Sequence, residues 1–109
     1  MAGDILIIDG VATNRIVLKV KLLASQYRVR PCATLNEART EIAASLPDLI
    51  LLDISNDAER MHAFCQSLKA DANTNLIPII ATGGFKTPRD RVVAPEAGAA
   101  DALSKPFDH

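Results

Sequence analysis

The sequence predicts a doubly wound parallel α/β sheet that forms one domain over residues 1–109. Short apolar runs alternate with stretches of helical periodicity along the chain, which is typical of parallel strands joined by helices. Three of the runs (DILII, DLILL and PIIAT) are apolar without alternation, as expected of strands that are covered on both faces. Aliphatic residues supply the core, since 49% of the chain is hydrophobic and only 4% is aromatic.

Five strands are expected along the chain, at Asp4–Ile8, Arg28–Cys32, Asp48–Leu52, Pro78–Thr82 and Asp101–Ser104. The second of them contains Pro31 and two alternating charges, Arg28 and Arg30. Proline cannot donate a hydrogen bond to a neighbouring strand, so this segment suits the edge of the sheet.

Four helices are expected between the strands. Thr13 is expected to cap the first helix. One apolar stripe of this helix is expected to face the sheet, formed by Ile16, Val20, Leu23 and Ala24. The second helix opens with a capping box over residues 34–37 (TLNE) and turns Ala38 and Ile42 inward.

The third helix is expected to open at Asn56 or Asp57. Its apolar residues repeat at helical spacing and are interpreted as core: Met61, Phe64, Cys65 and Leu68. Thr87 and Pro88 begin the fourth helix well, but Pro95 removes a backbone donor and should leave this helix short or kinked.

Composition excludes several classes of function. A formal net charge of −1 gives no bulk attraction to nucleic acid or to an anionic membrane. No apolar run reaches the roughly 18–20 residues that a membrane span needs, and the first residues lack the pattern of a secretion signal. Cys32 and Cys65 have no metal-ligand spacing, so we expect reduced thiols in a cytoplasmic protein.

The carboxyl ends of the strands are where such sheets carry their working site. Asp9 follows the first strand, Asp53 the third and Lys105 the fifth. Two carboxylates and a lysine suit a Mg²⁺ site beside a phosphate-binding cation, with an aspartate as a nucleophile towards phosphorus. The alternative is that the aspartates only start turns or cap helices.

The motifs around these residues resemble the receiver (response-regulator) domains of two-component signalling. They are DILIIDG, PDLILLD ending at Asp53, IPII, and EAGAADALSKPF, and the resemblance covers essentially the whole chain. It implies a flavodoxin-like strand order of 2-1-3-4-5. It also implies that Asp53 is the phosphoacceptor, that Lys105 stabilises the phosphoryl group, and that Asp9 and the backbone carbonyl of Ser55 hold Mg²⁺. Two stretches, TNRIVLKVKL and CQSLKADANTNLIP, are most similar to receivers attached to diguanylate cyclases, which implies an output domain of that kind beyond this chain.

The sequence departs from the family pattern at several positions. Gly10 replaces the second acid after the first strand, which should leave Mg²⁺ binding weak. Gly83 stands where the family has a serine or threonine, and Ala102 stands where it has the switch aromatic. The loop after Asp53 also differs, and Asn56 or Asp57 is an open alternative as a replacement ligand. The family's fifth helix is missing from this chain, so we expect a bare apolar face that promotes self-association.

We interpret the chain as a degenerate receiver that is not an enzyme and acts mainly by protein–protein contact. Its expected partners are a histidine kinase, another receiver domain or a second copy in a homodimer. The alternative is a conventional Mg²⁺-dependent receiver that a histidine kinase phosphorylates on Asp53.

Overall fold

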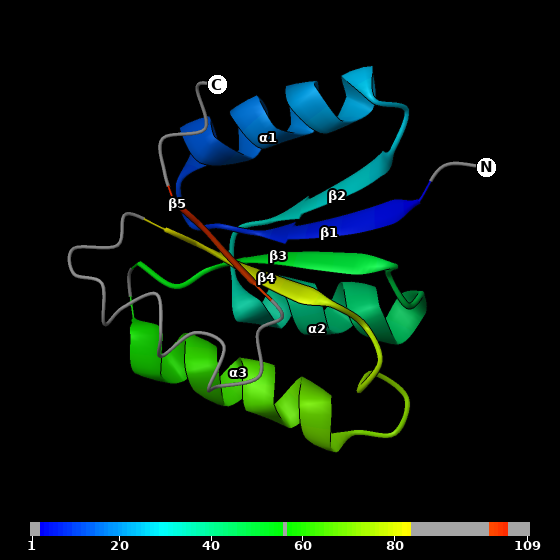
Figure 1. The fold of residues 1–109 in the computed structure, drawn as a ribbon, viewed down its shortest axis with the longest axis vertical. Coiled ribbons are helices and arrows are strands. Elements are labelled where there is room, and N and C mark those ends of the chain that lie inside the picture. The colour runs from blue at the N-terminus through cyan, green and yellow to red at the C-terminus, as the bar shows by residue number, and fades with distance from the viewer. Residues whose placement is uncertain (1–2, 56, 84–100, 105–109) are drawn as a thin grey trace.

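Five parallel strands form one sheet in the order β2-β1-β3-β4-β5, which confirms the predicted fold class and strand order (Figure 1). The structure is a computed structural model that describes residues 3–55, 57–83 and 101–104. The strands are β1 (Asp4–Ile8), β2 (Arg28–Cys32), β3 (Leu49–Asp53), β4 (Ile79–Gly83) and β5 (Asp101–Ser104).

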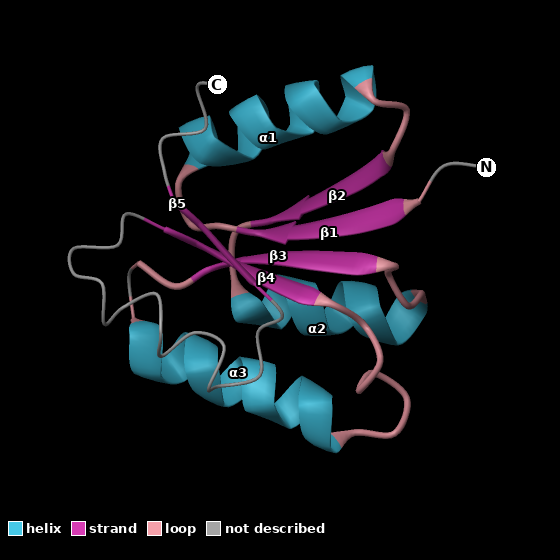
Figure 2. Cartoon of the chain, viewed as in Figure 1, coloured by secondary structure: helices cyan, strands magenta, loops and turns pink. Residues whose placement is uncertain are grey.

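Helices cover both faces of the sheet (Figure 2). Helix α1 (Ala12–Ala24) lies on one face, and helices α2 (Leu35–Ala44) and α3 (Ala58–Ala70) lie on the other. None of the helices in the described residues is long and apolar enough to cross a membrane. The expected fourth helix, with Thr87 and Pro95, lies outside the described residues.

The core is divided by the sheet into two clusters. Alternate residues of each strand point to opposite faces, so Leu6 and Ile8 join the cluster under α2 and α3, while Ile5 and Ile7 join the cluster under α1. Both sets are nearly or completely buried, which explains why the strand sequence shows no polar alternation. Phe64 from α3 is the largest of the fully buried side chains and belongs to the larger cluster.

Strands β3 and β4 each begin and end one residue later than predicted. The register pairs Ile5 with Leu49 and Asp53 with Thr82, so Asp53 is the last residue of its strand rather than the first residue after it. Asp48 instead precedes β3, and its carboxylate accepts a hydrogen bond from the backbone N–H of Asp4. Asp53 is therefore held by the sheet itself.

The predicted start and inner face of the first helix are wrong. The N-cap is Val11, which makes no side-chain cap, and Thr13 lies within the first turn. The proposed stripe faces outward, with Ile16 62%, Val20 63% and Leu23 49% exposed, and Ala24 is exposed too. The residues that face the sheet are Leu18, Val17 and Leu22. The helix is apolar on both sides, so periodicity alone does not decide which side packs.

The other two helices begin as predicted. The hydroxyl of Thr34 accepts a hydrogen bond from the Glu37 N–H at 3.1 Å, and the Glu37 carboxylate accepts one from the Ala33 N–H at 2.6 Å. Asp57 caps α3 by accepting from the Arg60 N–H at 3.2 Å. The predicted inward residues are buried in the core, with Met61 packed against it: Ala38, Ile42, Phe64, Cys65 and Leu68.

Arg30 explains the charge in edge strand β2. Its guanidinium pairs with the Asp4 carboxylate at 3.0 Å and donates to the backbone carbonyls of Glu41 and Ser45, each at 3.0 Å. Those two carbonyls lie at the end of α2, so the side chain ties the last turn of that helix to the sheet.

Candidate functional site

Asp9 and Asp53 lie at the carboxyl edge of two adjacent strands. Ile8 of β1 pairs with Leu52 of β3. Asp9 directly follows Ile8 in the sequence, and Asp53 directly follows Leu52. Both carboxylates belong to buried residues, with Asp9 1% and Asp53 6% exposed. The structure therefore brings together the two acids that the sequence singled out.

Backbone groups fix Asp9 at the end of β1. One carboxylate oxygen, Oδ1, accepts a hydrogen bond from the Val11 N–H at 2.9 Å. The Asp9 N–H donates to the Cys32 carbonyl, and the Asp9 carbonyl accepts from Arg15 Nη1 at 2.7 Å. The turn into α1 and the start of that helix thus hold the acid in place.

Ser55 makes two contacts with Asp53. The Ser55 N–H and the Ser55 hydroxyl both donate to Asp53 Oδ1, at 2.9 and 2.6 Å. Between them, the Ile54 N–H donates to the Thr82 carbonyl and continues the ladder of β3 and β4. Sequence reasoning gave Ser55 only a backbone carbonyl role and missed its hydroxyl. The signal that could have found it is a hydroxyl two residues after the acid, in a site where Gly83 has none.

Two glycines border the acids and differ in the space around them. A Cβ at Gly10 would meet only the Ala33 carbonyl, at 3.8 Å, so the position has room for a side chain. A Cβ at Gly83 would lie 2.8 Å from Ser55 Oγ and 3.6 Å from Asp53 Oδ1. Position 83 therefore borders the acidic site.

Strand β5 completes the edge on the other side. It pairs with β4 so that Ala102 is opposite Ala81 and Ser104 is opposite Gly83. Lys105, which follows β5 in the sequence, lies outside the described residues.

The donor atoms at this edge suit Mg²⁺ in type. The carboxylates of Asp9 and Asp53 and the backbone carbonyl of Ser55 are all hard oxygen donors, and Mg²⁺ commonly takes one or two carboxylates and completes its shell with water. Within the described ranges, no group of three or more His, Cys, Asp or Glu side chains could hold a metal. The set fits the ion but supplies little negative charge.

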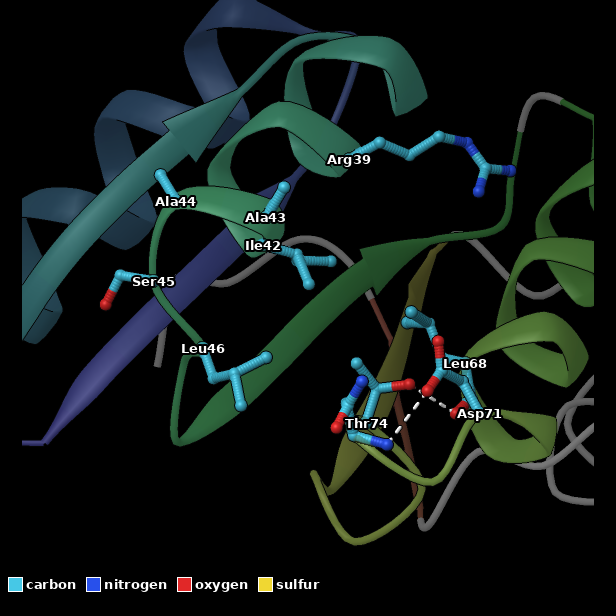
Figure 3. A pocket seen from close by; sticks show the side chains of 10 residues that line it. Arg39, Ile42, Ala43, Ala44, Ser45, Leu46, Leu68, Asp71 and Thr74 are labelled. Carbon is cyan, nitrogen blue, oxygen red and sulfur yellow. Dashed lines mark hydrogen bonds between the residues drawn. The ribbon is translucent and has the colours of Figure 1, made fainter.

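Hollows also lie away from this acidic site among the described residues. A groove of about 540 Å³ separates the C-terminal ends of α2 and α3, with Leu46, Leu68 and Asp71 among its lining residues (Figure 3). Helices run opposite to parallel strands, so this groove lies at the far edge of the sheet from Asp53. A smaller hollow of about 220 Å³ lies beside α1 and is lined by Arg15 and Lys19.

Both cysteines are buried free thiols, and their side chains belong to the core. Burial raises the pKa of the Cys32 thiol to about 11 and also raises the pKa of Cys65. Neutral thiols of this kind are poor nucleophiles and poor metal ligands.

Residues 5–109 match the family described as the response regulator receiver domain. The response regulator PleD of Caulobacter vibrioides is 34% identical over 108 residues, which are 99% of this chain and 24% of that protein. The KDP operon transcriptional regulatory protein KdpE of Escherichia coli is 31% identical over 104 residues, which are 95% of this chain and 45% of that protein. The chain thus spans less than half the length of these two relatives.

A solved structure with the same fold is the signal receiver domain of a signal transduction histidine kinase from Syntrophus aciditrophicus. It superposes with a TM-score of 0.85 at 32% identity, over 98% of this chain and 81% of that chain.

Proposed function

This chain belongs to the response regulator receiver domain family, and we propose that it is a receiver whose phosphorylation switch is weakened and which signals mainly through protein–protein contact. The observation that carries the proposal is the pair of buried carboxylates, Asp9 and Asp53, beside a Gly10 that contributes no third acid.

Asp53 is the proposed phosphoacceptor. One of its carboxylate oxygens forms a bond to phosphorus while the P–N bond of a phosphohistidine breaks, and the leaving imidazole nitrogen keeps the bonding electron pair and takes up a proton from solvent. The Ser55 N–H and hydroxyl, which both donate to Oδ1, orient the carboxylate for this attack. Lys105 is proposed to neutralise the transferred group.

Asp9, Asp53 and the Ser55 carbonyl are the residues that would hold Mg²⁺. A bound ion supplies positive charge that offsets the repulsion between the carboxylate and the incoming phosphoryl group. Ligand charge is a large part of what holds such an ion, so two carboxylates should bind it more weakly than three. The side chain missing at position 10 is therefore the proposed cause of a weak switch.

Helix α1 is the proposed contact surface for a histidine kinase or another receiver domain. Its sequence, ATNRIVLKVKLLA, has three basic residues and no acidic residue. Ile16, Val20 and Leu23 form an exposed apolar stripe on it. An apolar stripe with a basic border favours an amphipathic, acidic partner surface, and the helix begins three residues after Asp9. Self-association through the same stripe is the corresponding homodimer proposal.

The relatives are longer than this chain, and an output domain in the same protein is part of the proposal. A diguanylate cyclase is the output domain that the sequence resemblance favours. The receiver itself is proposed to bind and to switch without an enzymatic activity of its own.

A conventional Mg²⁺-dependent phosphoacceptor is the second candidate. It is favoured by one observation, the 2.6 Å hydrogen bond from the Ser55 hydroxyl to Asp53, because it places a hydroxyl at the acid although Gly83 has none. The two candidates differ in how strongly phosphorylation depends on the missing acid.

Intact-mass measurement of the purified chain with phosphoramidate, with and without Mg²⁺, tests the proposal. Wild type should gain a phosphoryl group slowly, Gly10→Asp should gain it at least about tenfold faster at the same Mg²⁺ concentration, and Asp53→Asn should gain none. Fast labelling of wild type that Gly10→Asp does not improve would establish the conventional candidate. Labelling that survives in Asp53→Asn would refute Asp53 as the acceptor.

A further inference from the structure

The Ser55 hydroxyl occupies the space beside Gly83. In the structure it donates to Asp53 Oδ1 at 2.6 Å, the length of a strong charge-assisted hydrogen bond. A Cβ at position 83 would lie only 2.8 Å from Ser55 Oγ, closer than such atoms pack in proteins. A side chain at position 83 and the Ser55 hydroxyl in this rotamer therefore exclude each other.

The two positions reach the same carboxylate from different strands. Position 83 ends β4, whereas Ser55 lies two residues beyond the end of β3. The hypothetical Cβ at position 83 is 3.6 Å from Asp53 Oδ1, so a hydroxyl carried there would also reach the acid. The Ser55 side chain, which follows β3, occupies the space beside the Asp53 carboxylate that a side chain at position 83 of β4 would otherwise occupy.

We propose that Ser55 is the positioning residue that supplies the site's hydroxyl in place of position 83, to the Asp53 carboxylate before phosphorylation and to a phosphoryl oxygen afterwards. This inference rests on the proposed role of Asp53 as phosphoacceptor. Phosphorylation removes the charge from the Asp53 oxygens and places new charge on the phosphoryl oxygens, so the hydroxyl gains a stronger acceptor there.

A Ser55 hydroxyl that binds the phosphoryl group would report phosphorylation through the loop after β3. Ser55 is two residues before Asp57, whose carboxylate caps α3 by accepting from the Arg60 N–H. A reorientation of Ser55 towards a phosphoryl group would therefore act on the start of α3 rather than on the segment after β4. The reorientation of Ser55 would disturb the N-cap hydrogen bond that Asp57 makes at the start of α3.

The test moves the hydroxyl from one strand end to the other. The chain is labelled with phosphoramidate, whose P–N bond breaks as Asp53 bonds to phosphorus and whose nitrogen leaves as ammonia with the protons it already carries. The variants are Ser55→Ala, Gly83→Ala and the double variant Ser55→Ala/Gly83→Thr. Each is made in wild type and in Gly10→Asp, and Ser67→Ala is the matched control because its hydroxyl bonds the Phe64 carbonyl within α3.

We expect Ser55→Ala to slow formation of the acyl phosphate by about tenfold, because the hydroxyl binds the developing phosphoryl charge more strongly than it binds the Asp53 carboxylate. Gly83→Ala should slow it as well, because the new Cβ displaces the hydroxyl although Ser55 is still present. The double variant should recover to within about threefold of its parent, and Ser67→Ala should match its parent. Thermal melts establish that each variant is folded.

The outcomes separate this inference from the proposed function. If neither wild type nor Gly10→Asp gains a phosphoryl group, the role of Asp53 is refuted and this inference falls with it. If both are labelled at Asp53 but Ser55→Ala and Gly83→Ala label at the parental rate, only the role of Ser55 is overturned. The role of Ser55 is also overturned if the double variant is folded but its labelling rate stays low. A hydroxyl at position 83 would then not replace the hydroxyl of Ser55.

Discussion

Mg²⁺ should reverse the effect of the Gly10→Asp substitution on the stability of this receiver. The position accepts a side chain without strain, since a Cβ there would meet only the Ala33 carbonyl at 3.8 Å and the backbone is outside the left-handed region. The new carboxylate would be the third acid at the edge that holds Asp9 and Asp53.

The size of the effect follows from the charges. Two unit charges about 5 Å apart interact by roughly 3 kcal/mol at an effective dielectric constant near 20. Gly10 is exposed, so solvent should reduce this repulsion to about 1 kcal/mol. Without Mg²⁺, Gly10→Asp should therefore be less stable than wild type by about 1 kcal/mol. With Mg²⁺ at about 100 times its dissociation constant, binding of the ion should raise the free energy of unfolding of the variant by roughly 2.7 kcal/mol.

Thermal unfolding at increasing Mg²⁺ concentration measures both terms. Gly10→Asp should melt about 4–8 °C below wild type in EDTA and above it at high Mg²⁺. Gly10→Asn is the matched control, because it adds the same volume without the charge and should gain no more from Mg²⁺ than wild type does. Equal Mg²⁺-dependent shifts in Gly10→Asp and Gly10→Asn would refute the claim that a missing carboxylate weakens the metal site.

Three further predictions concern the fold. Arg30→Met should cost about 2–3 kcal/mol of unfolding free energy in urea denaturation, because it removes the ionic partner of the Asp4 carboxylate and the hydrogen bonds to the Glu41 and Ser45 carbonyls, whereas Arg28→Met in the exposed part of β2 should cost little. Thr34→Ala should lower the free energy of unfolding by about 1 kcal/mol, because it removes the side-chain cap of α2. Thr13→Ala should leave the free energy of unfolding nearly unchanged, and an equal loss at Thr13 would contradict the observed start of α1. Finally, the buried Cys32 thiol has a pKa of about 11 against 9.0 for an exposed thiol, so the unfolded chain loses its proton first and stability should fall as pH rises from about 9 to 11. Cys32→Ala should flatten that decline, which equilibrium unfolding at several pH values measures.

Much of the fold can be predicted from the sequence because its signals are local. The uninterrupted apolar strands require cover on both faces, and the two-residue alternation of side chains then divides them between two clusters. The TLNE capping box starts α2 wherever that helix packs, since the bonds join Thr34, Glu37 and Ala33. The positions of Asp9 and Asp53 follow in the same way from strands that end beside each other.

Helix α1 shows where local signals stop. Both of its sides carry apolar residues at helical spacing, and the side with Leu18 packs on the sheet while Ile16 and Val20 remain exposed. The side that packs depends on how the connection from β1 orients the helix, and the hydrogen bond from Arg15 to the Asp9 carbonyl links the start of the helix to the end of that strand. The pattern of apolar residues within the helix does not determine this orientation.

The sequence by itself determined the strand order expected of the family, the two acids, and the two glycines where side chains are absent. Only the tertiary structure decided what those absences mean. Gly10 borders open space, whereas the space beside Gly83 is filled by a hydroxyl from a different strand end. Residues 55 and 83 are far apart along the chain and meet only because β3 and β4 are paired in this register, a contact between two strands that the sequence around either residue does not contain.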